Sequence, residues 1–188
     1  MDGTYGERGI TPAMRRIEAS QDHGKLVGCP EYALKEPDRF KEKLARQIID
    51  HPDRSAADLA AEIHDGIRYT FAFETEHYTR GTKQALDRLE SHGYELLVLR
   101  NSWGGAEYKG INCRWLDPDS GQRFEIQFHT PESWAAKQET HEAYEKIDNQ
   151  RTPQDERQRL RAMQAERSAR IPVPPAVSSI QDFRRDDR

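Results

Sequence analysis

The chain has 188 residues, of which 35% are hydrophobic and 33% are charged, and its formal net charge is −4 at pH 7. This length accommodates one domain, or one domain with a tail. The acidic balance gives no sign of a nucleic-acid-binding protein as a whole, so any affinity for phosphate groups must come from a local basic patch. No apolar run approaches the roughly 20 residues of a membrane span, and we expect no membrane partner.

The cysteine and histidine patterns predict no metal centre. The two cysteines, Cys29 and Cys113, form no CxxC motif, and the seven histidines form no HExxH pattern. One disulfide and two reduced core thiols both remain open. The polar start of the chain, MDGTYGERG, predicts no signal peptide, so Met1 is either a natural start or an expression start on a trimmed secreted chain.

Helices are predicted through the first third of the chain. Thr11 with Pro12 is a typical helix start. Residues 35–50 are predicted to form a second helix, because an apolar residue recurs there at every fourth position. Ser55 caps a short third helix, and Asp58 completes the capping-box pattern three residues later.

The helix over 35–50 also carries a basic stripe. Lys35, Arg39 and Lys43 recur at every fourth position. They form either a solvated edge paired with neighbouring acidic residues or a row of cations that faces a polyphosphate. The stripe by itself leaves both interpretations open.

A strand is predicted over 67–74, where apolar and polar residues alternate. Asp65 stands at its entrance and Arg68 follows on the strand. Such a pair can hold a hydrated metal beside an anion, or it can be a turn aspartate and a surface arginine. A helix over 79–91 and a short, well-buried strand over 94–100 follow.

The stretch 108–130 predicts a β-hairpin around which the chain is organised. Residues 117–121, DPDSG, have turn chemistry, and the flanking runs alternate with period two. One face of the hairpin is apolar and can be buried. The other face carries Asn112, Arg114, Glu125, Gln127 and His129. This polar face is either a solvated surface or a functional site.

The remainder of the chain is predicted to be helical and then irregular. One helix runs from Thr130 to about Ile147, and an Arg-rich helix occupies 151–170. We expect residues 171–188 to form a Pro-rich, charged and loosely ordered tail. The predicted fold class is α/β (α+β), with a mixed sheet of about five strands flanked by helices, in a domain over 1–150 with its core at 35–147.

Several of these segments resemble, in order, the synthetase domain of the RelA/SpoT family of nucleotide pyrophosphokinases. The resemblance runs from about Lys35 to Tyr144. It rests on the basic stripe, on Asp65 with Arg68, on YKGIN (108–112), on EIQFHT (125–130) and on His141 with Tyr144. The segments are most similar to secreted bacterial ATP nucleotide 3'-pyrophosphokinases and RelA-like toxin domains, which implies a secreted protein, with a cytoplasmic one as the alternative.

The chain also departs from the family pattern. Asn112 stands where the family has a histidine that helps to recognise the acceptor, and His129 stands where it has an arginine. Asp65 lies three residues before Arg68, where most of the family has five. These differences leave the acceptor preference open.

The resemblance implies a nucleotidyltransferase-like fold and a defined reaction. The β,γ-pyrophosphate of ATP would pass to the 3'-hydroxyl of a purine nucleotide, giving (p)ppApp- or (p)ppGpp-type products. Asp65 and Glu125 would bind Mg²⁺, Glu125 would alternatively be the general base, and Gln127 would orient the acceptor. The expected ATP ligands are Lys35, Arg39, Lys43, Arg68 and Arg80, and the expected acceptor ligands are Tyr108, Lys109, Asn112 and His141.

Two other functions remain open at this stage. A toxin-type enzyme would pyrophosphorylate the 3' end of tRNA and would use the Arg-rich helix as a second basic surface. A nucleotide-binding module would have lost catalysis, although the presence of both Asp65 and Glu125 argues against that. We expect the protein to be a monomer.

Overall fold

The computed structural model describes residues 9–29, 33–34, 37–149 and 151–185. Its centre is a six-stranded mixed sheet with the order β1-β2-β5-β4-β3-β6. The strands are β1 (Gly24–Leu26), β2 (Arg68–Phe73), β3 (Glu95–Asn101), β4 (Ile111–Leu116), β5 (Arg123–His129) and β6 (Phe183–Arg184). The β2–β5 pair is parallel and every other pair is antiparallel. The expectation of a mixed sheet flanked by helices is therefore confirmed, with short β1 and β6 at its edges.

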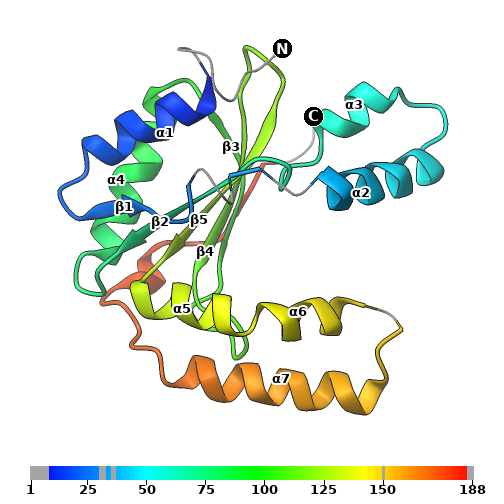
Figure 1. The fold of residues 1–188 in the computed structure, drawn as a ribbon. Coiled ribbons are helices and arrows are strands. Elements are labelled where there is room, and N and C mark those ends of the chain that lie inside the picture. The colour runs from blue at the N-terminus through cyan, green and yellow to red at the C-terminus, as the bar shows by residue number, and fades with distance from the viewer. Residues whose placement is uncertain (1–8, 30–32, 35–36, 150, 186–188) are drawn as a thin grey trace.

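Within the described residues, seven α-helices flank the sheet (Figure 1). They are α1 (Ile10–Ala19), α2 (Pro37–Asp50), α3 (Ala56–Ala61), α4 (Tyr78–Ser91), α5 (Pro131–Glu139), α6 (His141–Asp148) and α7 (Gln154–Ala169). Helices α1 and α4 lie on one side of the sheet, whereas α2 with α3 and α5 with α6 and α7 lie on the other (Figure 1). None of the described helices is long and apolar enough to cross a membrane.

The apolar face of the hairpin forms the main core under α1 and α4. Phe124, Ile126 and Phe128 of β5 are fully buried, as are the alternate residues of β4. The contact with α4 is close, because a Cβ added to Gly81 would lie 2.4 Å from the ring of Phe73. The hairpin itself, with its Asp117–Gly121 turn, forms as predicted.

Two local expectations need correction, those for the helix over 130–147 and for the strand over 94–100. The helix predicted over 130–147 is two helices, because it breaks at Thr140, whose hydroxyl donates to the Ala136 carbonyl at 2.8 Å. A hydroxyl that bonds back to the preceding turn favours a bend. Strand β3 is not well buried: only Leu99 is, because its other face is open and its outer neighbour β6 has two residues. The apolar stripe of α2 contains no fully buried residue.

Over residues 171–185 the tail packs against the sheet, whereas we expected a loosely ordered segment. Every third residue from Ile171 to Ile180 is buried, and the segment includes a short 3₁₀ helix over Val177–Ser179, which has three residues per turn. The Asn101 side chain donates to the carbonyls of Val177 at 2.9 Å and Ile180 at 2.8 Å. This anchoring brings β6 alongside β3.

Candidate functional site

The polar face of the sheet carries a row of charged residues across its centre. Glu125 of β5 is level with Arg68 of β2 on one side and Arg114 of β4 on the other. In the antiparallel β4–β5 pair, side chains at such directly opposed positions have their Cβ atoms about 5 Å apart. Glu125 is 9% exposed. The sheet register thus places the nearly buried Glu125 between two arginine positions on the neighbouring strands.

A second row lies beside the first. Thr70, Gln127, Asn112 and Arg100 are level with one another on β2, β5, β4 and β3. Gln127 is buried, and its Nε2 donates to Oε1 of Glu125 at 2.5 Å. The two residues of the EIQ segment therefore act as one hydrogen-bonded unit. The structure brings together the polar side chains that the sequence placed on this face.

Lys137 of α5 extends this unit and was not predicted from the sequence. Its Nζ donates a hydrogen bond to Oε1 of Gln127 and lies 4.7 Å from the ring centroid of Trp134. An ammonium group can only donate, so Gln127 must turn its carbonyl oxygen to Lys137 and its amide nitrogen to Glu125. Burial and the charge of Arg68 lower the pKa of Lys137 to about 7, against the opposing effect of Glu125.

The spacing along α5 held a signal for Lys137. Ser133 and Ala136 are the buried residues of this helix, and Lys137 lies four and one positions after them. A residue four positions after a buried one shares its helix face. Lys137 was therefore identifiable as a cation on the sheet-facing side of α5.

Tyr108 belongs to a hydrogen-bonded network next to the two rows. Its hydroxyl lies 2.8 Å from Oδ1 of Asn112, to which it donates, and 2.9 Å from Nε2 of His129. Nδ1 of His129 lies 2.9 Å from Oγ of Ser133. Burial lowers the pKa of His129 well below its usual value, which keeps the imidazole neutral. The two positions that depart from the family pattern, 112 and 129, thus both contact Tyr108.

Gly110 gives this network its space. A Cβ added there would lie 2.9 Å from Cε1 of His129 and 3.0 Å from the Tyr108 hydroxyl oxygen. Lys109, expected to bind the acceptor, here donates to the carbonyls of Trp103 at 2.9 Å and Gly105 at 2.7 Å. Its ammonium therefore orders the loop before β4.

Asp65 lies in a turn before β2, at the entrance of the strand, as the sequence predicted. Nζ of Lys43, on α2, donates to Oδ1 of Asp65 at 2.6 Å. Tyr144 lies near both acids: partial burial raises the pKa of its phenol, and the charges of Asp148, Glu125 and Asp65 raise it further. Lys43 and both predicted metal ligands therefore lie on the same side of the sheet.

The remaining predicted residues occupy three different places. Arg39 of α2 forms an ion pair with Glu145 of α6, and Nδ1 of His141 lies 3.5 Å from the same carboxylate. Arg80 is exposed on α4, which packs on the opposite face of the sheet, so the structure does not bring it to this site. Lys35 lies outside the described residues.

Across the described ranges, no group of three or more histidine, cysteine, aspartate or glutamate side chains could hold a metal ion. Asp65 and Glu125 are two carboxylates, and Mg²⁺ in nucleotide enzymes is commonly held by one or two carboxylates together with substrate phosphates. The donor chemistry of the pair fits that pattern. Cys29 and Cys113 are both free thiols, which resolves the disulfide question for this structure.

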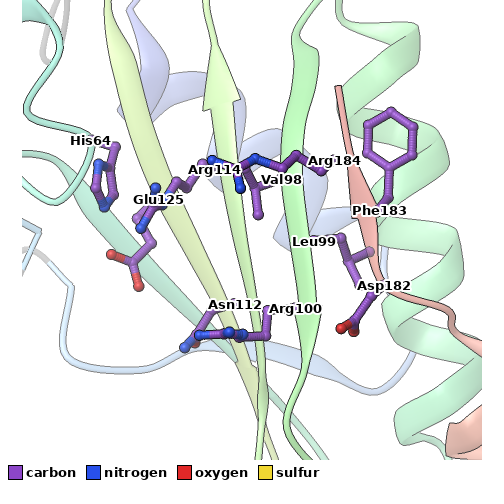
Figure 2. A pocket seen from close by; sticks show the side chains of 10 residues that line it. All are labelled: His64, Val98, Leu99, Arg100, Asn112, Arg114, Glu125, Asp182, Phe183 and Arg184. Atoms are coloured by element: carbon purple, nitrogen blue, oxygen red, sulfur yellow. The ribbon is translucent and has the colours of Figure 1, made fainter. Parts of the chain in front are cut away.

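A cavity of about 550 Å³ opens on the polar face between Glu125 and β6. Its wall includes His64, Asn112 and Arg114, and Figure 2 shows its side chains spread across β5, β4, β3 and β6. Burial, together with the charge of Arg114, lowers the pKa of His64 to about 4, so this imidazole is neutral at physiological pH. The cavity lies directly beside the charged row.

Solved structures with this architecture include small alarmone synthetases. Small alarmone synthetase 1 from Bacillus subtilis superposes with a TM-score of 0.55 at 16% identity, over 84% of this chain and 81% of that one. Its complex with the product pppGpp gives 0.54 at 14% identity, over 83% and 82% of the two chains. A GTP pyrophosphokinase family protein from Streptococcus pneumoniae gives 0.54 at 16% identity, over 83% and 78%.

The chain has the small alarmone synthetase fold. At the sequence level, no protein-family model and no curated protein matches it. The structural likeness extends over most of the chain and confirms the fold that the ordered motifs predicted. Within that alarmone synthetase fold, the polar face of the sheet is the candidate active site.

Proposed function

We propose that this alarmone-synthetase-like chain is a nucleotide pyrophosphokinase. The reaction is the transfer of the β,γ-pyrophosphate of ATP to the 3'-hydroxyl of a purine nucleotide. The observation that supports it is Glu125, nearly buried between Arg68 and Arg114, bonded to Gln127, and flanked by the α2 cations on one side and by Tyr108 with Asn112 on the other. The similar B. subtilis structure that holds pppGpp supports the same reaction class.

In the proposed reaction, the acceptor 3'-oxygen forms a bond to the β-phosphorus of ATP. The bond between that phosphorus and the oxygen bridging to the α-phosphate breaks, and AMP leaves. Glu125 accepts the hydroxyl proton, and Gln127 holds the carboxylate in place through its 2.5 Å hydrogen bond. Positioning and charge neutralisation dominate such reactions, because the protein performs little covalent chemistry.

Several cations near Glu125 can neutralise the phosphate groups of the donor. Lys43 lies beside Asp65, and Arg68 lies beside Glu125, so both can neutralise the triphosphate of the donor. Arg39 would exchange its Glu145 partner for a phosphate group. With Glu125 as the base, a bound Mg²⁺ would be held by Asp65 together with phosphate oxygens and would supply further charge neutralisation. Tyr108 would stack on the acceptor base and Asn112 would contact it.

The tRNA alternative lacks a specific observation in its favour. The Arg-rich helix α7 was its expected basic surface, but Arg161, Arg167 and Arg170 form ion pairs with Glu107, Glu139 and Glu166. These pairs neutralise much of that surface. Secretion and a monomeric state are further parts of this proposal, to be checked by fractionation of the producing cells and by light scattering of the purified protein.

The deciding assay supplies ATP and Mg²⁺ with AMP, GMP, ATP, GTP or tRNA in separate reactions. We expect 3'-pyrophosphorylated product on free purine nucleotides. Glu125→Gln should fold and lose activity, whereas Glu90→Gln, which changes an exposed carboxylate on α4, should not. Product on tRNA alone would replace this function by the toxin-type one, and full activity in Glu125→Gln would remove Glu125 from the mechanism.

A further inference from the structure

The cavity beside Glu125 is lined by three guanidinium groups that the reaction above does not use. They belong to Arg100 of β3, Arg114 of β4 and Arg184 of β6. Within the part of the chain that the structure describes, none of them lies within ion-pair distance of a carboxylate. Two carboxylates also line the cavity, Glu125 and Asp182, and Asp182 accepts a hydrogen bond from the Asn101 backbone at 2.8 Å.

The sheet register aligns these arginines with Glu125. Arg114 is level with Glu125 and with Val98, and Val98 is level with Arg184. Arg184 therefore shares the polar face, whereas its neighbour Phe183 is level with the buried Leu99 and belongs to the other face. At about 4.8 Å per strand, Arg114 is one strand and Arg184 is three strands, or about 14 Å, from Glu125.

The order of residues along this row places the donor ATP on one side of Glu125 and the acceptor nucleotide on the other. The α2 cations and Asp65 lie toward β2, so the phosphates of the donor ATP belong on that side. Tyr108 and Asn112 lie toward β4, on the side of the cavity. An acceptor with its 3'-hydroxyl at Glu125 can extend its 5'-phosphate chain along the cavity toward β6. Unpaired guanidinium groups are suited to bind such a chain, because their planar forks match phosphate oxygens.

We propose that the cavity binds the 5'-phosphates of the acceptor nucleotide, and that Arg184 of the C-terminal strand selects acceptors with a long phosphate chain. This inference rests on the proposed function. Arg114 lies near the first phosphate of any acceptor. Arg184, farther from the reacting centre, meets only the outer phosphates. The tail thereby carries a specificity determinant of the site.

The test compares acceptors that differ only in phosphate number. KM is measured at saturating ATP for GMP and GTP, or for AMP and ADP if only adenine nucleotides react. The variants are Arg184→Gln and Arg184→Lys, with Arg159→Ala on the exposed face of α7 as a charge-matched control. Neither substitution at 184 removes a backbone hydrogen bond of β6. If the tail is cleaved by protease at the wild-type rate in both variants, β6 remains paired with β3.

We expect Arg184→Gln to raise KM for GTP about tenfold, as expected for one lost hydrogen bond to a charged group. KM for GMP should change less than about twofold, and Arg184→Lys should fall between the wild type and Arg184→Gln. Equal effects on GTP and GMP, or no effect on either, would overturn the proposal.

Equilibrium binding of GTP and GMP without ATP separates this inference from the proposed function. A selective loss of GTP affinity in Arg184→Gln supports the phosphate subsite even if no variant forms product. Normal turnover without any selective loss retains the pyrophosphokinase and rejects the subsite.

Discussion

Lys137 donates a hydrogen bond to Gln127, and this contact sets which end of the Gln127 amide faces Glu125. The ammonium group lies against the ring of Trp134, 4.7 Å from its centroid, so it is held in place by α5 as well as by the sheet. Lys137 is therefore a positioning residue, and it acts on the reacting centre through Gln127.

Replacement of Lys137 by Met should lower kcat about tenfold, which corresponds to about 1.4 kcal/mol. The reason is that the Gln127 carbonyl oxygen loses its donor in a buried place, so the amide no longer has one preferred orientation. Steady-state kinetics at saturating ATP and acceptor measure the effect. Lys83→Met, at an exposed position on α4, serves as the control. Wild-type kcat in Lys137→Met would show that Gln127 needs no external restraint.

Lys137 should also make the stability of the protein depend on pH. Its pKa is lowered from 10.5 to about 7 in the folded state. Between these values the unfolded chain binds a proton that the folded chain has released, so the free energy of unfolding rises with pH across this window. Urea unfolding at pH 7, 8 and 9 should show the wild type gaining stability relative to Lys137→Met. Parallel pH profiles of the two proteins would contradict the lowered pKa.

Two substitutions of Tyr108 separate the roles of its ring and its hydroxyl. Tyr108→Phe retains a ring for stacking but loses the contacts with Asn112 and His129. Tyr108→Ala loses both, and stacking on a base is worth roughly 1–3 kcal/mol. We expect Tyr108→Ala to raise the acceptor KM much more than Tyr108→Phe, with the KM for ATP unchanged. Equal effects would assign the role to the hydroxyl, and a raised KM for ATP would exchange the two subsites.

Gly81 is required for the packing of α4 on the sheet. An added Cβ would lie 2.4 Å from Cδ1 and Cε1 of Phe73, whose ring stacks with Phe71 and Phe128. Gly81→Ala should therefore destabilise the protein by about 1–3 kcal/mol, the usual cost of overpacking a core. Urea unfolding measures it, with Gly104→Ala as the control, because no atom lies within 4 Å of a Cβ added there. Equal stability of both variants would mean that α4 shifts freely.

Asn101 anchors the tail through two carbonyl groups, those of Val177 and Ile180. Asn101→Ala should release the segment from 171 to 185 and make it several-fold more sensitive to brief proteolysis, because local opening becomes easier. Ser179→Ala, at an exposed tail position, is the matched control. Unchanged protection in Asn101→Ala would show that the buried Ile171, Val177 and Ile180 hold the tail without it.

The predictable parts of this fold are those whose signal is local. The hairpin follows from period-two alternation on either side of a Pro- and Gly-containing turn, and the Ser55 cap follows from a four-residue pattern. The residues of the EIQ segment were identifiable in the same way, because alternation alone places Glu125 and Gln127 on one face.

The other parts depend on contacts between distant segments. Arg39 and Glu145 are 106 positions apart, and no local sequence pattern predicts that they form an ion pair. The sheet edges are similar, since β6 has only two residues and forms because Asn101 and the buried tail residues bring it to β3. The Pro-rich composition of the tail suggested poor order, whereas in the structure the tail is held by contacts with Asn101 and with the core.

Strand β6 pairs with a strand made more than 80 residues earlier, and it supplies one wall of the cavity beside Glu125. Because ribosomes synthesise proteins from the N-terminus, β1 to β5 and the helices α1 to α7 emerge before it. A nascent chain can thus form most of its core while this cavity still lacks its outer wall. The cavity can therefore be completed only after β6 has been synthesised.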